Sequence, residues 1–419
     1  MKASFPRPLP AKRITPAIFN EGLTPLSTMA KAPTETSFFV PRYIPQFDGL
    51  RGVAVLMVLI THSGSLELLP HAGMLKYAGY GVLDSYFVLS GFLITGILLD
   101  SKGSEHYFRN FYARRAVRIW PLYYLVLFLV FVVEPLFVPA MRPTVAGIWP
   151  AFAFYVQNLI YHDAYPFGLG ATWSLAVEEQ FYITWPLLIF FLKKRTLAIL
   201  LFSLFVVSLS LRLAFYFRGA ASGYVHQYTF SRLDAITFGS LAALWLRSPS
   251  CTLVRWRTWS YRSLSIGAAG TLLARILMHR NSSVVGYTFL GLMYTGLVGL
   301  LLISDTRSSL LGRSFSARWL RYMGRISYGI YLLHLPLFTF WARFINTQNF
   351  LSNPVSRNLF AFSGQILMAT IAGAISWYFF EEPILRLKER FPSGSAMHSR
   401  TGREPATILL DLDSVVRES

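Results

Sequence analysis

The sequence predicts an all-α, polytopic membrane protein with about ten transmembrane helices. Three observations lead to this prediction: apolar residues come in long runs, charged residues are scarce, and basic residues gather in alternate loops. Only 14% of the 419 residues are charged and 54% are hydrophobic, whereas a soluble domain carries roughly a quarter charged residues. Too few charges remain to cover a soluble surface.

The apolar runs are long enough to cross a bilayer as helices. A span takes about 20 residues, and it must be helical because lipid cannot satisfy exposed backbone polar groups. The expected spans are residues 50–69, 79–99, 119–139, 173–192, 196–217, 230–247, 263–278, 284–303, 322–341 and 359–380.

The formal net charge of +19 would suit a nucleic-acid partner, so the positions of the basic residues decide its meaning. They cluster before the first span and within residues 109–118, 193–195, 255–262 and 307–321, while the intervening loops carry few. Lys and Arg are enriched in cytoplasmic loops, so both termini are predicted to be cytoplasmic. The charge therefore indicates a lipid bilayer as partner, and no nucleic acid.

The chain divides into three expected segments. Residues 1–45 form a basic, disordered tail without the apolar core of a signal peptide. Residues 46–390 form one transmembrane domain, and residues 391–419 form a polar C-terminal tail. Cys251 is the only cysteine, which excludes an intramolecular disulfide and a multi-cysteine metal site. No other metal-ligand spacing is present, so no metal is expected.

Polar residues within the spans are few, and each needs a reason because a charge at the bilayer centre costs about 2.5–3.5 kcal/mol. The first span, FDGLRGVAVLMVLITHSG, contains Arg51 and His62. Eleven residues make about three helical turns, so both side chains share a face about 16 Å apart. A cation at the membrane surface and an imidazole deeper in suit a donor that arrives from the cytoplasm. The alternative is a histidine that hydrogen-bonds a neighbouring carbonyl.

Spans two and three carry a second polar group. Asp84 lies in span two, and Ser90 begins a Ser-Gly pair that allows close helix packing. Arg114, Arg115 and Arg118 precede the third span. Topology alone favours basic residues there. Three guanidiniums on neighbouring turns could equally clamp the phosphates of a nucleotide-like donor.

The fourth span, ATWSLAVEEQFYITWPLL, brings two carboxylates into the membrane. Ser174, Glu178 and Tyr182 share one helical face, so Glu178 rather than Glu179 is expected to face a polar interior. At comparable depth, Glu178 and His62 could meet, and the carboxylate would then fix the imidazole as a general base. The alternative is an ion pair that only orients the helices.

Three weaker features follow. Arg232 and Asp234 are expected to pair with each other, and His334 lies near the middle of span nine. Glu381-Glu382-Pro383 is expected to end the last helix, because proline disfavours helix at the preceding residue. The further polar residues expected around a cavity are Asp84, Ser90, Asp234 and His334.

From about Phe47 to Pro383, the motifs resemble the acyltransferase 3 family of bacterial membrane O-acyltransferases. The most specific element is Arg51, ten intervening residues and His62. The other matches, in order, are Asp84 with FVLSGFLI, RRAVRIWPLYY, WSLAVEEQFY, the Arg232/Asp234/Gly239 segment, ISYGIYLLH and the closing Glu-Glu-Pro. Val82 and Ser85 depart from the pattern, where glycine and an apolar residue are expected.

The resemblance implies transfer of an acyl group, usually acetyl, from cytoplasmic acyl-CoA to a hydroxyl of a cell-envelope or secreted carbohydrate-type acceptor, at the bacterial inner membrane. It implies that His62 is the catalytic histidine with Arg51 as its motif partner. Arg115 and Arg118 match the donor-binding motif, and Glu178 matches the leading glutamate. Many relatives append an extracellular hydrolase-like domain that this sequence does not show, so transfer is expected to finish in the membrane unit or with a separate partner.

Two other functions fit a helical membrane protein. A secondary transporter would use intramembrane His, Asp and Glu as a proton relay, and broken-helix pairs in two related halves would favour it. A membrane scaffold would use the polar residues only for helix packing. The sequence leaves open the acceptor, the acyl length, whether His62 is a base or an acyl carrier, and whether the protein is a homo-oligomer.

Overall fold

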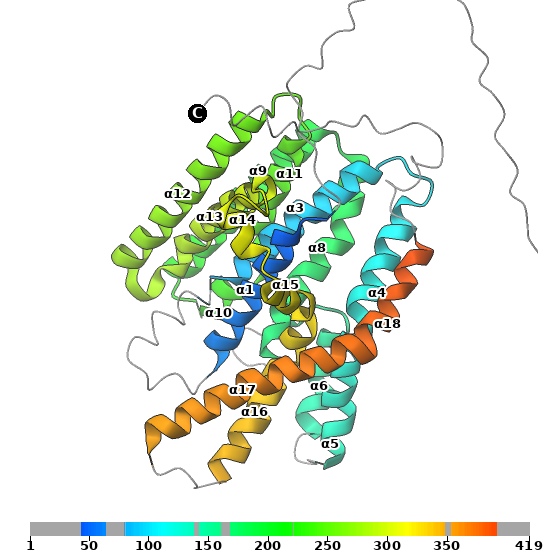
Figure 1. Ribbon diagram of the computed structural model, residues 1–419, viewed down its shortest axis with the longest axis vertical. Coiled ribbons are helices and arrows are strands. Elements are labelled where there is room, and N and C mark those ends of the chain that lie inside the picture. Colours follow the sequence, from blue (N-terminus) through cyan, green and yellow to red (C-terminus); the bar gives the residue numbers. More distant parts are fainter. Residues whose placement is uncertain are drawn as a thin grey trace, which may run out of the picture. The chain divides into compact units, whose positions relative to one another are not determined.

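The computed structural model describes residues 43–63, 79, 81–137, 142–160, 168–220, 222–347 and 353–391. Within these ranges every regular element is helical (Figure 1). Five described helical stretches are long and apolar enough to cross a membrane: Leu83–Ser101, Tyr107–Phe137, Lys194–Phe217, Ser283–Ile303 and Val355–Arg390. The all-α fold class is therefore confirmed for the described residues, and the five stretches support a membrane protein.

Every expected span overlaps a helix, although the number that cross a membrane stays a prediction. These helices are α1 (Pro45–His62), α3 (Leu83–Ser101), α4 (Tyr107–Phe128), α8 (Thr172–Phe191), α9 (Lys194–Phe217), α11 (Leu233–Leu246), α12 (Leu253–Met278), α13 (Ser283–Ile303), α16 (Ser327–Thr347) and α17 (Pro354–Ser376). Helix α4 continues through a π-helical turn, η2 (Leu129–Val133), into α5 (Glu134–Phe137). Between the long helices lie α6 (Arg142–Ala153), α7 (Gln157–Ile160), α10 (Ser222–His226), α14 (Leu310–Phe315) and α15 (Arg318–Arg325), with short 3-10 turns.

Helix α1 begins earlier than the expected span and ends at His62. Pro45 stands at the start, where the missing backbone N–H costs nothing. Ser63 then adopts an extended conformation, with φ −74° and ψ 105°. His62 is therefore the last residue of its helix, and not an internal residue as residues 50–69 implied.

The prediction that Glu381-Glu382-Pro383 ends the last helix is wrong. Helix α17 continues through a π-helical turn, η7 (Trp377–Glu381), into α18 (Glu382–Leu385) and the 3-10 helix η8 (Arg386–Arg390). Pro383 lies near the start of α18, where proline is tolerated. This continuation brings α18 and η8 against α4, which matters for the site described below.

Helices α3 and α11 approach each other backbone to backbone, as the Ser-Gly pair of span two predicts. A Cβ atom on Gly91 would lie 2.1 Å from the Ile236 carbonyl oxygen, and one on Gly239 would lie 2.2 Å from that of Val88. Both glycines therefore have no room for a side chain. Extensive contacts also join α1 to α15, α12 to α13 and α16 to α17.

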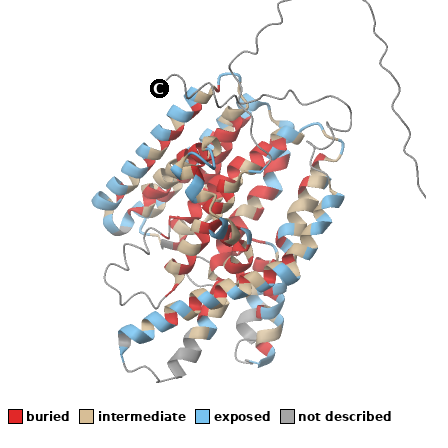
Figure 2. Ribbon diagram, in the orientation of Figure 1, coloured by how far each residue is buried: buried red, intermediate tan, exposed pale blue. Residues whose placement is uncertain are grey.

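Burial is highest on α1, α3, α8 and α11, while α12 and α17 present long exposed faces (Figure 2). Several of the most exposed side chains are large and apolar: Phe191 is 73% exposed, Phe217 78% and Phe379 81%. Water would make such surfaces costly, whereas hydrocarbon accommodates them. These faces are therefore expected to contact lipid.

Introduced cysteines can test the predicted topology, because the single native cysteine is poorly reactive. Cys251 is buried, and burial raises the pKa of its thiol to about 11. Little thiolate forms at neutral pH, so the native protein should react slowly with maleimides. We expect an Arg218→Cys variant in right-side-out vesicles to react with a membrane-impermeant maleimide, and an Arg307→Cys variant to react only after permeabilisation. Equal labelling of both variants in intact vesicles would contradict the predicted orientation.

Candidate functional site

An open cavity of about 970 Å³ lies where α1, α3, α4, α8 and α16 meet. Its charged and hydroxyl-bearing walls come from all five helices. They are Arg51, Tyr86, Ser90, Arg115, Arg118, Ser174, Glu178, Tyr182, Ser327, Tyr328 and Tyr331. The structure thus brings together Arg51, Ser90, Arg115, Arg118 and Glu178, five of the residues that the sequence selected.

Glu178 belongs to a compact hydrogen-bonded group on the cavity wall. Its carboxylate accepts hydrogen bonds from Ser90 Oγ at 2.7 Å and from the Tyr182 hydroxyl at 3.3 Å. Ser174, Glu178 and Tyr182 all line the cavity, as their spacing on one face of α8 predicts. Glu179 turns elsewhere, and its carboxylate accepts a hydrogen bond from Trp120 Nε1 at 3.4 Å.

The three cations of the cavity differ in how they are held. The Arg51 guanidinium donates to Asp48 at 3.0 Å. The Arg115 guanidinium carbon lies 5.2 Å from the centroid of the Tyr182 ring, a cation–π contact. Within the described ranges, neither Arg115 nor Arg118 donates a hydrogen bond to a protein oxygen. Their N–H groups are therefore available to an anionic ligand.

Arg114 has a different role from its two neighbours. It donates to the backbone carbonyl of Phe391 at 2.8 Å and more weakly to that of Lys388 at 3.4 Å. It therefore ties the end of η8 to α4, which the sequence motif alone does not reveal.

His62 lies beside His334, because α16 packs against α1. His334 Nε2 is 3.0 Å from His62 Nδ1, and His334 Nδ1 is 2.7 Å from the Tyr331 carbonyl oxygen. A carbonyl only accepts, so His334 Nδ1–H donates to it and, in the neutral ring, His334 Nε2 accepts from His62 Nδ1–H. The lone pair of a neutral His62 then lies on Nε2.

The described contacts do not pair His62 with Glu178 as the sequence suggested, because each has another partner. Tyr331 contacts both the cavity wall and the histidine pair. Its hydroxyl is 2.5 Å from Ser174 Oγ in the cavity wall, and its ring centroid is 5.8 Å from that of His334. The histidine pair therefore adjoins the cavity through Tyr331.

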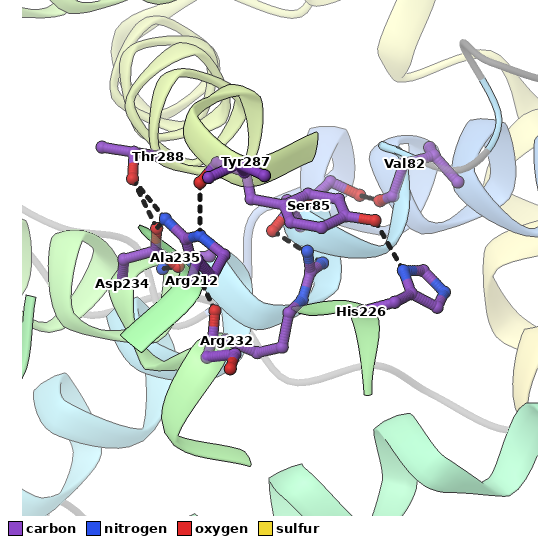
Figure 3. Close-up of polar contacts among 12 residues, drawn as sticks. Val82, Ser85, Arg212, His226, Arg232, Asp234, Ala235, Tyr287 and Thr288 are labelled. Carbon is purple, nitrogen blue, oxygen red and sulfur yellow. Dashed lines mark hydrogen bonds and ion pairs between the residues drawn. The ribbon is translucent and has the colours of Figure 1, made fainter. Parts of the chain in front are cut away.

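Asp84 and Asp234 lie in buried ion pairs and are not among the residues that line the cavity. Figure 3 shows Asp234 beside Arg212. Arg232 donates to Asp84 at 3.0 Å, and Arg212 donates to Asp234 at 2.6 Å, with all four side chains fully buried. The expected pairing of Arg232 with Asp234 is therefore wrong. Arg212 of α9, which the sequence motifs do not indicate, pairs with Asp234. Arg232 pairs with Asp84 of α3 instead.

Aromatic and hydroxyl groups complete this network (Figure 3). Thr288 donates to Asp234 at 2.8 Å, and the Arg232 guanidinium carbon lies 3.5 Å from the Tyr287 ring centroid. The Tyr287 hydroxyl is 2.5 Å from His226 Nδ1. The contacts join α3, α9, α11 and α13, so the network fixes how these helices pack. Among the described residues, no group of His, Cys, Asp or Glu could hold a metal ion.

Comparison with known proteins agrees with the motifs. Residues 44–377 match the family model Acyl_transf_3, described as an acyltransferase domain. The chain is 32% identical over 375 residues to the putative peptidoglycan O-acetyltransferase YrhL of Bacillus subtilis, covering 82% of this chain and 55% of that protein. It is 31% identical to the peptidoglycan O-acetyltransferase OatA of Listeria monocytogenes, covering 83% and 57%, and 28% identical to the O-acetyltransferase OatA of Staphylococcus aureus, covering 89% and 62%.

The chain thus spans between 55% and 62% of the length of these relatives. No solved structure matches it significantly. The family model covers well over half of the chain and includes the cavity, the arginine pair and both histidines. The chain therefore belongs to the acyltransferase 3 family.

Proposed function

We propose that this protein is a multi-pass O-acyltransferase of the bacterial inner membrane. It transfers an acyl group, most simply acetyl, from cytoplasmic acyl-CoA to a hydroxyl of a cell-envelope glycan. The observation that carries the proposal is one cavity whose wall holds two arginines that, among the described residues, donate no hydrogen bond to a protein oxygen, with an oriented histidine pair beside it. The names of the relatives make a peptidoglycan-type glycan the first acceptor to test.

The donor assignment follows from the charge of the cavity. Arg115 and Arg118 lie on the expected cytoplasmic side of α4 and, within the described part of the chain, donate no hydrogen bond to a protein oxygen. A phosphate-bearing donor suits them, because guanidinium binds phosphate oxygens in a bidentate manner. With its phosphates there, the acyl end of acyl-CoA is directed towards the cavity and the histidines.

The chemistry requires a base for the acceptor hydroxyl. His62 Nε2 carries the lone pair in the hydrogen-bond arrangement described above and takes the hydroxyl proton as the oxygen attacks the thioester carbonyl. The carbon–sulfur bond then breaks, and the proton on His62 passes to the departing thiolate. His334 is a positioning residue, since it sets the tautomer of His62.

A second route uses the same atom. His62 Nε2 attacks the thioester carbonyl, the carbon–sulfur bond breaks, and the CoA thiolate leaves with the proton given up by the imidazole. The acyl group stays on Nε2 until the acceptor hydroxyl displaces it and returns its proton to the ring. Rapid quenching of the protein with labelled acetyl-CoA in the absence of acceptor distinguishes the routes, because only the second leaves label on the chain.

Glu178 acts within the cavity wall in this proposal. Its carboxylate fixes the hydroxyls of Ser90 and Tyr182, and the Tyr182 ring supports the Arg115 guanidinium. Glu178 therefore positions Arg115, and Arg51 contributes a further cation to the same wall.

Replacing both Arg115 and Arg118 by methionine is expected to raise the KM for acetyl-CoA by about 100-fold, since two charge-assisted contacts to phosphate are lost. The kcat should change much less. An Arg109→Met variant is the matched control, because Arg109 is an exposed cation of the same helix. Initial rates over a range of acetyl-CoA concentrations measure both constants. An unchanged KM in the double variant would show that the pair only sets topology.

The proposed function is tested in cells by mass spectrometry of envelope glycans, with and without the protein. Loss of an O-acetyl ester from peptidoglycan fragments, restored by the native chain but not by a His62→Ala variant, is the expected result. Identical ester content in all strains, across peptidoglycan and the other envelope glycans, would contradict the proposal.

A further inference from the structure

A second cavity, of about 750 Å³, adjoins the first and shares Arg115 and Arg118 with it. Two more basic residues line it: Arg114 from α4 and Lys388 from η8. No Asp or Glu is among its lining residues. Four basic side chains line this cavity with no carboxylate among them, so it is suited to a ligand with several negative charges.

Three of the four cations remain for such a ligand. Arg114 is occupied, because it donates to the carbonyls of Phe391 and Lys388. In the part of the chain that the structure describes, the Lys388 ammonium makes no hydrogen bond or ion pair, like Arg115 and Arg118. Arg114 thus holds the segment that carries Lys388, and Lys388 lines the cavity with its amino group.

Lys388 lies beyond residues 44–377, where the family model matches. Its position depends on the helical continuation through α18 and η8, which packs on α4. The cavity therefore combines a motif from the family region with a cation from the chain that follows it.

We propose that Lys388, fixed by Arg114, completes with Arg115 and Arg118 a subsite for the phosphate groups of the nucleotide end of the donor. This rests on the proposed function, in which acyl-CoA is the donor. The diphosphate and 3′-phosphate of CoA supply several negative charges, whereas the pantetheine arm supplies none. The shared arginines place the subsite next to the first cavity, where the uncharged arm and the acyl group belong.

The test is calorimetric binding of CoA, dephospho-CoA and pantetheine to the full chain in nanodiscs of neutral lipid. We expect native affinity to fall in that order. Lys388→Met should weaken CoA binding by about tenfold or more, because one charge-assisted contact is lost, and should leave pantetheine binding unchanged. Arg386→Met is the matched control, an exposed cation of the same 3-10 helix, and should bind CoA like the native chain.

Several results would overturn the subsite. These are native CoA affinity in Lys388→Met, an equal loss in Arg386→Met, an equal loss for pantetheine, or no CoA binding by the native chain. A Lys388→Met effect that appears only when phosphatidylglycerol is added would assign the cation to lipid headgroups and also overturn it. Tight, Lys388-dependent CoA binding without acetyl transfer to any acceptor would instead contradict the proposed function and leave the subsite supported.

Discussion

A His62→Ala variant is expected to lose about 100- to 10,000-fold in kcat for acetyl transfer, the usual contribution of a general base. The KM for acetyl-CoA should change little, because in the proposed mechanism Arg115 and Arg118, and not His62, bind the donor phosphates. Initial rates with labelled acetyl-CoA and a glycan acceptor measure both constants. A covalent role for His62 predicts a loss at least as large.

His334 provides a second test, because in the proposed mechanism it acts only by orienting His62. His334→Leu removes the acceptor for His62 Nδ1–H, whereas His334→Gln keeps an acceptor oxygen in the side chain. We expect about a tenfold or greater loss in kcat for the leucine variant, with part of the activity retained by the glutamine variant. If folded His62→Ala protein had the kcat of the native protein, the histidine pair would have no role in the mechanism.

Breaking the buried ion pair of Asp234 is expected to have the largest effect on stability. Asp234→Ala leaves the Arg212 guanidinium buried without its carboxylate, which costs about 3–5 kcal/mol. Asp100→Ala breaks the pair with Arg247, also 2.6 Å long but with Asp100 half-exposed, and should cost about 1 kcal/mol or less. Chemical unfolding in one detergent, followed by circular dichroism, compares the two variants.

Equal stability of Asp234→Ala and Asp100→Ala would contradict the structural role of the network. A double variant, Arg212→Met with Asp234→Leu, adds a second check, since replacing a whole buried pair by apolar residues is often close to neutral. If it folds and retains acetyl transfer, the network serves packing. Loss of activity in a stable, folded double variant would instead place Asp234 in the chemistry.

Periodicity within one helix predicted local features well. The shared face of Ser174, Glu178 and Tyr182 depends on spacing along one helix. The close helix packing at Gly91 followed from the small residues of the Ser-Gly pair. The helical character of the spans followed from apolar run length. Helix ends were harder, because Pro45, Ser63 and Pro383 act through backbone conformation rather than hydropathy.

Contacts between helices could not be predicted from the sequence. Nothing in the motif of α1 or α16 states that His62 meets His334, and the sequence paired His62 with Glu178 on depth alone. Asp234 pairs with Arg212, which is 22 residues away in the sequence, and not with its near neighbour in the sequence, Arg232. The reason is that α9 and α13 pack against α11. Lys388 lies beyond Pro383, where the sequence predicts the end of the helix, so its place beside Arg115 and Arg118 follows only from the continuation through α18 and η8.

Acetyl transfer by the purified full chain in vesicles tests the proposed function most directly. Labelled acetyl-CoA is placed on the side of the expected cytoplasmic face, and a peptidoglycan fragment on the opposite side of the membrane. Label is expected to appear as an alkali-labile ester on the glycan with native protein and not with His62→Ala. Movement of a small solute with protons but no ester, or no label on any glycan hydroxyl, would contradict the proposed function.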